Sequence, residues 1–156
     1  MKKTVKSMVD EATAAITTYS IEEARDLHGR DDVQFIDIRD IRELEREGVI
    51  PGAFHAPRGM LEFWVDPESP YHKPVFAQDK QLVLFCAAGW RSALATKTLQ
   101  DMGLERVAHI DGGFSAWKAA GLPVSTEAAT PTPATFPELP MSDVMLTQAD
   151  VQAALG

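Results

Sequence analysis

The chain of 156 residues is poor in cysteine: it has one, Cys86, together with four histidines and two tyrosines. A single cysteine excludes an intrachain disulfide, so the fold does not depend on an oxidising compartment. Any second thiol that reacts with Cys86 must come from another molecule. Because one cysteine and four histidines show no metal-ligand spacing, we expect no bound metal and no other cofactor.

Basic residues are also in the minority, with 15 Lys and Arg against 23 Asp and Glu, for a net charge of −8. This balance argues against a general nucleic-acid binder, which needs a basic surface. No apolar run approaches the length of a membrane span. The basic residues at 1–6 are followed by Asp10 and Glu11 rather than by the apolar core of a signal peptide. We therefore expect a cytoplasmic protein that binds neither nucleic acid nor membranes.

Strand-like and helix-like segments alternate along most of the chain. Ser20 and Asp40 each stand three residues before a glutamate, which is the capping-box pattern of a helix start. Nearly continuous apolar runs indicate strands that are covered on both faces. The expected strands are 33–37, 82–85 and 106–110, and the expected helices are 21–27, 41–47, 92–102 and 114–120. This alternation predicts an α/β fold with a mainly parallel sheet.

The two ends of the chain differ from its centre. Residues 1–16 have weak helical spacing, and we expect them to form an N-terminal extension. Residues 126–156 contain four prolines in their first half, which predicts an extended linker, followed by a short C-terminal helix. The expected folded domain is 17–125, and the C-terminal tail could dock a protein partner or cover a pocket.

The most informative segment is 82–92, where a strand-like run ends at Cys86 and a loop of small residues leads into a helix. In open α/β sheets, ligands bind beyond the carboxyl ends of the strands. A thiol at such an end faces the unpaired N–H groups and the positive dipole of the next helix, which favour the thiolate. We therefore expect a reactive Cys86, although a buried lone cysteine is often an inert small hydrophobe.

Four motifs resemble the rhodanese family, in the order that the family has them. Residues 86–92 fit its active-site pattern Cys-x-x-Gly-x-Arg-Ser, and residues 35–39 resemble its Asp-x-Arg strand end. Residues 48–53 resemble its Gly-His-Ile-Pro-Gly-Ala turn, with valine where histidine is common. Residues 112–117 resemble its closing Gly-Gly-x-x-x-Trp element. The resemblance spans 17–125 and implies a rhodanese-like domain, with a five-stranded, mainly parallel sheet flanked by helices.

Catalytic members of this family transfer a sulfane sulfur from a donor such as thiosulfate to a thiol or to cyanide, through a persulfide on the cysteine. The resemblance therefore implies a sulfurtransferase of the thiosulfate:cyanide type, with Cys86 as the catalytic residue. Its expected partners are a small sulfur donor and a thiol or cyanide acceptor.

The loop residues suit this chemistry. Small residues allow successive backbone N–H groups to turn towards an anionic sulfur: Ala87, Ala88 and Gly89. Arg91 could grip an anionic donor or hold the loop in shape. Ser92 is expected to cap the following helix or brace the loop. Trp90 could form a wall of the pocket or contact a partner. All six residues are substrate-binding candidates.

Several residues near these motifs have two possible roles. Arg91 could form a structural ion pair with a carboxylate such as Asp37 instead of meeting substrate. Asp37 and Arg39 are expected to be structural, bracing the loop that follows their strand. Arg58 could supply positive charge to the substrate site. His55 and His72 are expected in turns or at the surface.

Two other functions are compatible with part of the sequence pattern around Cys86. Cysteine phosphatases and arsenate reductases use Cys-x5-Arg, which is one residue longer than segment 86–91 and makes a wider cradle for a tetrahedral oxyanion. A non-catalytic or regulatory rhodanese module is the second alternative, in which the fold serves to bind a partner.

Overall fold

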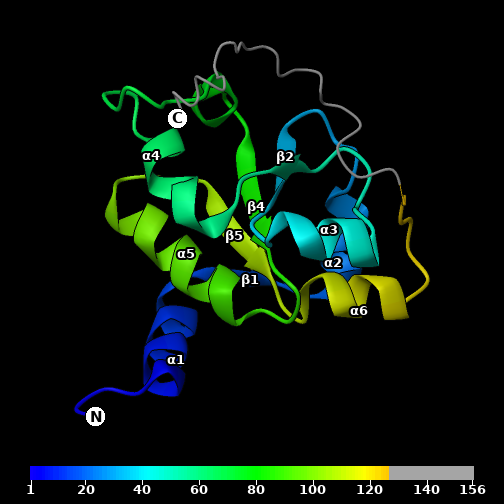
Figure 1. Ribbon diagram of the computed structural model, residues 1–156, viewed down its shortest axis with the longest axis horizontal. Helices are drawn as coiled ribbons and strands as arrows, with labels where there is room; N and C mark the ends of the chain where they lie inside the picture. The colour runs from blue at the N-terminus through cyan, green and yellow to red at the C-terminus, as the bar shows by residue number, and fades with distance from the viewer. Residues whose placement is uncertain (127–156) are drawn as a thin grey trace. The chain divides into compact units, whose positions relative to one another are not determined.

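The computed structural model describes residues 1–126. Its five strands form one sheet in the order β1-β5-β4-β2-β3, and neighbouring strands pair in parallel (Figure 1). The strands are β1 (Thr17–Tyr19), β2 (Val33–Asp37), β3 (Phe54–His55), β4 (Gln81–Phe85) and β5 (Val107–Ile110). The helices are α1 (Val5–Ala15), α2 (Ile21–Leu27), α3 (Ile41–Glu47), α4 (Leu61–Val65), α5 (Trp90–Asp101) and α6 (Gly113–Ala119), with short 3-10 turns η1 (Arg58–Met60) and η2 (Pro74–Ala77). The expected α/β class and the five-stranded sheet are confirmed.

The sheet is covered on both faces, which explains its apolar central strands. Leu82 and Leu84 of β4 belong to a core cluster with residues of α4 and α5. Val83 and Phe85 alternate with them and belong to a second cluster with residues of α2 and α6. The two helix layers lie on opposite sides of the sheet in Figure 1. Successive side chains of a strand point to opposite faces, so both sets must be apolar.

Both predicted capping boxes are present. The Ser20 hydroxyl accepts a hydrogen bond from the Glu23 N–H at 3.1 Å, and the Glu23 carboxylate accepts one from the Ser20 N–H at 2.9 Å. Asp40 and Glu43 form the same pair at the start of α3. These bonds satisfy N–H groups that the first helical turn leaves without partners.

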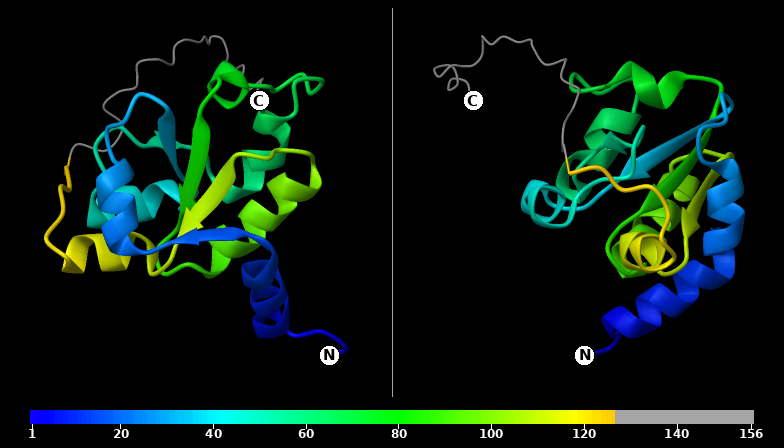
Figure 2. Two further views of the ribbon diagram at one scale, coloured as in Figure 1. Left: turned by 180° about the vertical axis from the view of Figure 1, so that it is seen from behind. Right: turned by 90° about the vertical axis from the view of Figure 1, so that its right-hand side faces the viewer.

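The N-terminal helix is part of the domain core. Val9 and Ala12 of α1 pack against Ala93 of α5, and residues Met1–Ser125 form one compact unit. Figure 2 shows α1 leading directly into the edge strand β1. The predicted extension at 1–16 is therefore a helix that packs on α5, whereas the predicted linker and C-terminal helix lie outside the described residues, apart from Thr126.

The structure differs from the sequence-based expectation at several boundaries. Helix α5 begins at Trp90 rather than at Ser92. The two-residue strand β3 was not expected, because so short a segment has no periodicity. Val49, at the start of the predicted turn, forms an isolated antiparallel bridge with Ser125. Among the described residues, no helix is long and apolar enough to cross a membrane.

Candidate active site

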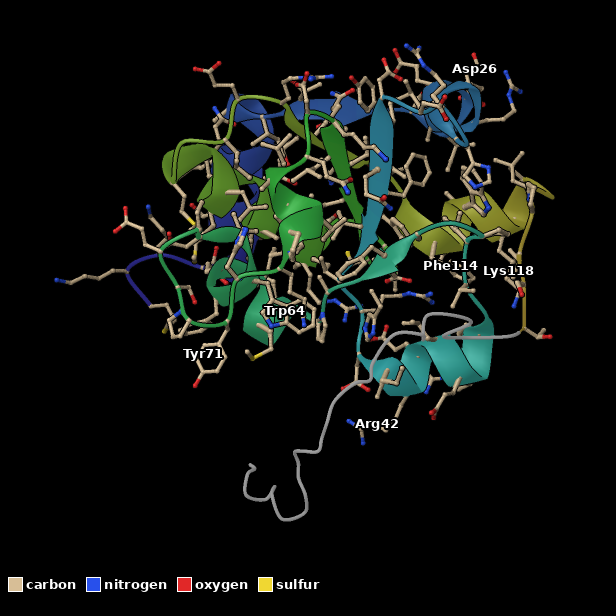
Figure 3. All side chains as sticks on the ribbon, turned by 90° about the horizontal axis from the view of Figure 1, so that it is seen from above. Asp26, Arg42, Trp64, Tyr71, Phe114 and Lys118 are labelled. Carbon is tan, nitrogen blue, oxygen red and sulfur yellow. The ribbon has the colours of Figure 1, made fainter. Side chains whose placement is uncertain are left out.

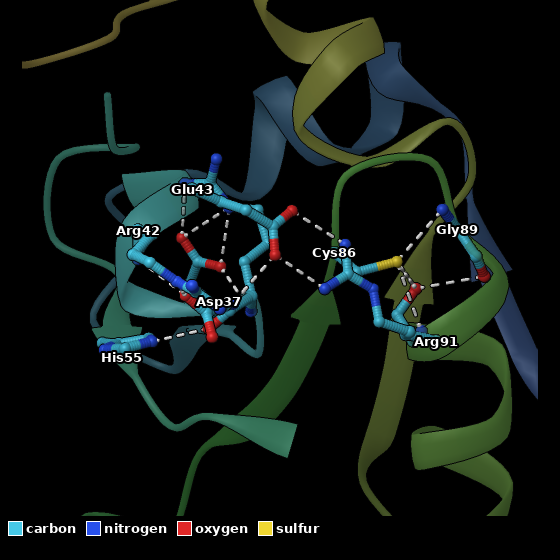
Figure 4. A network of polar contacts seen from close by, with 10 residues as sticks. Asp37, Arg42, Glu43, His55, Cys86, Gly89 and Arg91 are labelled. Atoms are coloured by element: carbon cyan, nitrogen blue, oxygen red, sulfur yellow. Dashed lines mark hydrogen bonds and ion pairs between the residues drawn. The ribbon is translucent and has the colours of Figure 1, made fainter. Parts of the chain in front are cut away.

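Cys86 lies at the carboxyl end of β4, directly before the loop that leads to α5. Its side chain is buried, with 1% of the residue exposed. The Gly89 N–H donates a hydrogen bond to Cys86 Sγ at 3.1 Å, and the Ser92 N–H donates one at 3.4 Å (Figure 4). The sulfur therefore occupies the N-terminal end of a twelve-residue helix, where N–H groups and the helix dipole favour a negative charge.

Gly89 gives this loop its shape. Its φ of +119° is a left-handed conformation that side chains with a Cβ disfavour, and the residue is the N-cap of α5. This conformation directs the Gly89 N–H towards the sulfur. The prediction that the successive N–H groups of residues 87–89 turn towards the sulfur is correct for Gly89 and wrong for Ala87 and Ala88. The second backbone donor to the sulfur is Ser92. Ser92 is not the helix cap; its other expected role, bracing the loop, fits the 3.3 Å contact between its Oγ and the Gly89 carbonyl oxygen.

The loop is held from the other side by α6. The Phe114 N–H donates to the Cys86 carbonyl oxygen at 2.8 Å, and the Ser115 N–H donates to the Ala87 carbonyl oxygen at 3.0 Å. This approach requires glycine at position 113, since a Cβ there would clash with the Cys86 carbonyl oxygen. The buried Trp117 anchors the helix and donates from Nε1 to the Pro123 carbonyl at 2.7 Å. The Gly-Gly-x-x-x-Trp motif thus braces the cysteine loop.

Arg91 forms an ion pair with a carboxylate, one of the two roles considered for it, but the partner is Glu43 and not Asp37. Its Nη1 and Nη2 donate to the two carboxylate oxygens of Glu43 at 2.8 and 2.9 Å. This bidentate pair lowers the pKa of Glu43 to about 2 against the opposing effect of burial. The pKa of Arg91 is raised, mainly by Glu43 and to a smaller extent by the Cys86 sulfur. In Figure 4, the Arg91 guanidinium lies between Glu43 and Cys86.

Asp37 and Arg39 form a buried ion pair beside this site. Arg39 Nη2 lies 2.8 Å from Asp37 Oδ2, and both side chains are at most 2% exposed. The same Nη2 donates to the Gly48 carbonyl at 2.8 Å, and the guanidinium carbon lies 4.0 Å from the centre of the Phe114 ring. Asp37 and Arg39 therefore tie together the end of β2, the end of α3 and the start of α6.

Of the remaining candidates, Trp90 directly follows the cysteine loop, whereas Arg58 and His55 have their partners elsewhere. Trp90 is 52% exposed at the first turn of α5. The Arg58 N–H donates to the Ile38 carbonyl beyond the end of β2, but its guanidinium pairs with Glu62 at 2.8 Å, and no contact between Arg58 and the cysteine loop is recorded in the described structure. His55 Nε2 lies 2.7 Å from the Arg39 carbonyl oxygen.

Sequence reasoning missed two residues of the site, Glu43 and His109. Glu43 was interpreted only as a capping residue, a role it also has, since it accepts from the Asp40 N–H at 3.0 Å. His109 lies in β5 with its Nδ1 2.9 Å from Ser92 Oγ. The available signal for His109 was a single histidine in an otherwise apolar strand. In residues 1–126 no group of three or more His, Cys, Asp or Glu side chains is arranged to bind a metal ion.

An α/β domain with a cysteine loop at the end of a central parallel strand is thus established, and comparisons place it in a family. Residues 20–120 match the model of the rhodanese-like domain. A sulfurtransferase from Allochromatium vinosum is 32% identical over 94 residues, which are 60% of this chain and 79% of that protein. The thiosulfate sulfurtransferase GlpE of Pseudoalteromonas translucida is 31% identical over 102 residues, covering 65% of this chain and 88% of that protein. The chain therefore belongs to the rhodanese-like domain family, as its motifs indicated.

A solved structure from Rhodopseudomonas palustris is also similar. It is 56% identical to this chain, has a TM-score of 0.78, and the match covers 80% of this chain and 96% of that one. That protein is described as one of unknown function and a possible tyrosine phosphatase.

Proposed function

We propose that this protein is a sulfurtransferase that carries a sulfane sulfur on Cys86, taking it from thiosulfate or a similar donor and passing it to a thiol or to cyanide. The observation that carries the proposal is the position of Cys86 Sγ, which accepts hydrogen bonds from two N–H groups at the start of α5. Relatives named as sulfurtransferases support the same reaction class.

The chemistry needs an anionic sulfur at two stages. The Cys86 thiolate attacks the outer sulfur of thiosulfate, the S–S bond of the donor breaks, and sulfite leaves with its electron pair. The product is a persulfide, which is itself an anion near neutral pH. The acceptor nucleophile then takes the terminal sulfur and the Cys86 thiolate leaves. The fixed donors of Gly89 and Ser92 suit both anions, since they need no reorganisation during the reaction.

Arg91 has the geometry to serve both of the roles considered for it. Its two hydrogen bonds to Glu43 hold the end of the loop, while 41% of its side chain remains exposed. The exposed part offers positive charge to an anionic donor, in a protein whose net charge of −8 would otherwise repel it. Trp90 and Arg58 are proposed as further substrate-binding residues, and Asp37 and Arg39 as structural support of the cysteine loop.

Loop length favours sulfur transfer over phosphate hydrolysis. Segment 86–91 has one residue fewer between cysteine and arginine than the Cys-x5-Arg cradle of cysteine phosphatases. The description of the Rhodopseudomonas palustris protein makes a direct comparison worthwhile. The purified protein should load sulfur from thiosulfate and hydrolyse aryl phosphates no faster than the Cys86→Ser variant does. Efficient, Cys86-dependent hydrolysis would contradict the argument from loop length.

The first experiment is intact mass measurement of the reduced protein after incubation with thiosulfate. A gain of one sulfur atom that cyanide removes, and that Cys86→Ser does not show, would support a persulfide carrier. If thiosulfate fails and a mercaptan donor succeeds, thiosulfate is the wrong donor. If both donors fail, the function as a binding module becomes the better explanation.

A further inference from the structure

A line of close polar contacts runs from the cysteine through the domain to its surface. Cys86 Sγ lies 3.6 Å from Ser92 Oγ, and Ser92 Oγ lies 2.9 Å from His109 Nδ1. On the far side of the imidazole ring, His109 Nε2 lies 3.2 Å from Thr18 Oγ1. The contacts join the cysteine loop and the start of α5, which follow one another in the chain, to β5 and β1, which are separate in sequence.

Burial changes sharply along this line. Cys86, Ser92 and His109 are at most 3% exposed, whereas Thr18 lies on the edge strand β1 and is exposed. Burial lowers the pKa of His109, and the nearby Asp111 carboxylate opposes this shift in part. At neutral pH the ring is therefore uncharged, with a proton on one nitrogen and a lone pair on the other.

This line of contacts has two alignments in which every sulfur, hydroxyl and ring nitrogen has a partner. Ser92 Oγ also lies 3.3 Å from the Gly89 carbonyl oxygen, a longer contact than the 2.9 Å to His109 Nδ1. In the first, the Cys86 thiol donates to Ser92 Oγ, the Ser92 hydroxyl donates to His109 Nδ1, and Nε2–H donates to Thr18. In the second, Nδ1–H donates to Ser92 Oγ, the Ser92 hydroxyl donates to the anionic sulfur, and the Thr18 hydroxyl donates to Nε2. Both hydroxyls can donate and accept, so the line can reverse direction.

We propose that His109 is a positioning residue that sets the direction of the Ser92 hydroxyl, so that Ser92 accepts from the Cys86 thiol and donates to the thiolate or persulfide. The proton balance is complete. The thiol proton passes to Ser92 Oγ, the Ser92 proton passes to His109 Nδ1, and the Nε2 proton leaves to water at Thr18. The inference rests on the proposed function, since it assigns a means of stabilising the anion that carries the sulfur.

A purely structural role for His109 makes a different prediction. A buried polar side chain needs hydrogen-bond partners, and Ser92 and Thr18 provide them whatever state Cys86 is in. In that case the loss of the ring nitrogens would alter stability but not the reactivity of a folded protein. The proposal instead requires that thiol reactivity and the protonated nitrogen of His109 change together.

The test is the pH profile of Cys86 alkylation by iodoacetamide in the full chain, with thermal unfolding as a check on folding. His109→Phe keeps a buried ring but has no nitrogen, and should move the alkylation profile to higher pH by about one unit, as expected for losing one hydrogen bond to a charged group. His109→Asn keeps an amide near the Nδ1 position and should reverse most of this shift. A His109→Phe protein that unfolds like the wild type and has the wild-type profile would overturn the proposal.

Two neighbouring threonines give a matched pair of variants on the surface. Thr18→Val removes the hydroxyl at Nε2 and should move the profile to higher pH by about half a unit, the size of a neutral hydrogen bond. Thr17→Val is equally exposed, but its side chain points to the other face of β1 and should leave the profile unchanged. Equal profiles for these two variants would contradict the proposal even if His109→Phe does not fold.

Nitrogen-15 NMR of the histidine side chains provides a direct readout. The proton should lie on His109 Nε2 while Cys86 is a thiol, and on Nδ1 once the sulfur is anionic. A tautomer that stays fixed across this change would overturn the proposal. The alkylation and NMR measurements need no sulfur donor, so they test the role of His109 by itself. Failure of the proposed sulfur transfer would instead appear as the absence of a persulfide in the mass measurement.

Discussion

Arg91 and Glu43 are 48 positions apart in the chain and meet through two hydrogen bonds of 2.8 and 2.9 Å. Glu43 also closes the capping box of α3 with the Asp40 N–H. One carboxylate therefore links the first turn of α3 to the first turn of α5. The helix start and the end of the cysteine loop depend on the same side chain.

Replacing Glu43 should lower the stability of the domain. Glu43→Gln retains an acceptor for the cap but loses the charge that Arg91 binds, and should cost about 1–2 kcal/mol at pH 7, since the pair is partly buried. Glu23→Gln is the matched control, because Glu23 has the same capping role and no recorded arginine partner. Urea unfolding measures both, and a Glu23→Gln loss as large as that of Glu43→Gln would contradict the assignment.

The same carboxylate predicts a pH dependence with a definite sign. The pKa of Glu43 falls from 4.5 to about 2 in the folded protein. Its stabilising contribution is therefore complete above pH 4.5 and is lost as the pH falls towards 2. The difference in unfolding free energy between wild type and Glu43→Gln should shrink across this window. A difference that stays constant from pH 5 to pH 2 would refute the prediction.

Glycine at position 113 should be indispensable to the loop. In Gly113→Ala the new Cβ would clash with the Cys86 carbonyl oxygen, at a φ of +58°, so α6 and the loop must separate. We expect loss of most sulfur transfer and a destabilisation of about 2–4 kcal/mol, the range for strain with broken buried hydrogen bonds. Gly121→Ala isolates the backbone effect, because its φ is +75° and, apart from its chain neighbours, no atom lies within 4 Å of the place that its new Cβ would take. It should cost about 1 kcal/mol and leave transfer intact.

Breaking the buried pair beside the site should be costly. Asp37→Asn leaves the Arg39 guanidinium buried with one neutral partner in place of a carboxylate, and should destabilise the domain by about 3–5 kcal/mol. Asp101→Asn removes the exposed ion pair with Lys97 and should cost less than about 1 kcal/mol. Similar urea midpoints for the two variants would show that the Asp37–Arg39 pair has no structural importance.

Arginine at position 91 should not be replaceable by lysine. An ammonium group cannot reproduce the planar fork that binds both oxygens of Glu43, so Arg91→Lys should lower kcat/KM for the sulfur donor about tenfold or more. Arg42→Lys is the control, because the Arg42 side chain is 82% exposed and points away from the domain in Figure 3. If Arg91→Lys is as active as Arg42→Lys and the wild type, positive charge alone, and not the fork, assists the donor.

Local patterns in the sequence predicted most elements of the fold. The capping boxes at Ser20 and Asp40 and the apolar runs of the central strands depend on neighbours in the chain, so they can be read from it. The strand β3 could not, because it consists of Phe54 and His55 held by pairing with β2.

The residues of the cysteine loop were predictable from the sequence, but the side chains that contact them were not. The loop 86–92 was identified by its residue types and spacing, whereas the partner of Arg91 depends on how α3 and α5 meet at one end of the sheet. Asp37 was the more obvious candidate, but Arg39 already occupies both of its oxygens. His109 could not be assigned at all without knowing that Ser92 lies opposite it.

The brace that α6 gives to the cysteine loop has a consequence for synthesis of the chain. On the ribosome, Cys86 emerges before residues 113–117. The carbonyl oxygens of Cys86 and Ala87 therefore cannot accept their hydrogen bonds until the N–H groups of Phe114 and Ser115 have been synthesised. Until then the nascent thiol lacks the brace that holds its loop in shape. The reactive centre is thus among the last parts of the domain to be assembled, and a translation product that stops before Trp117 carries the cysteine without its site.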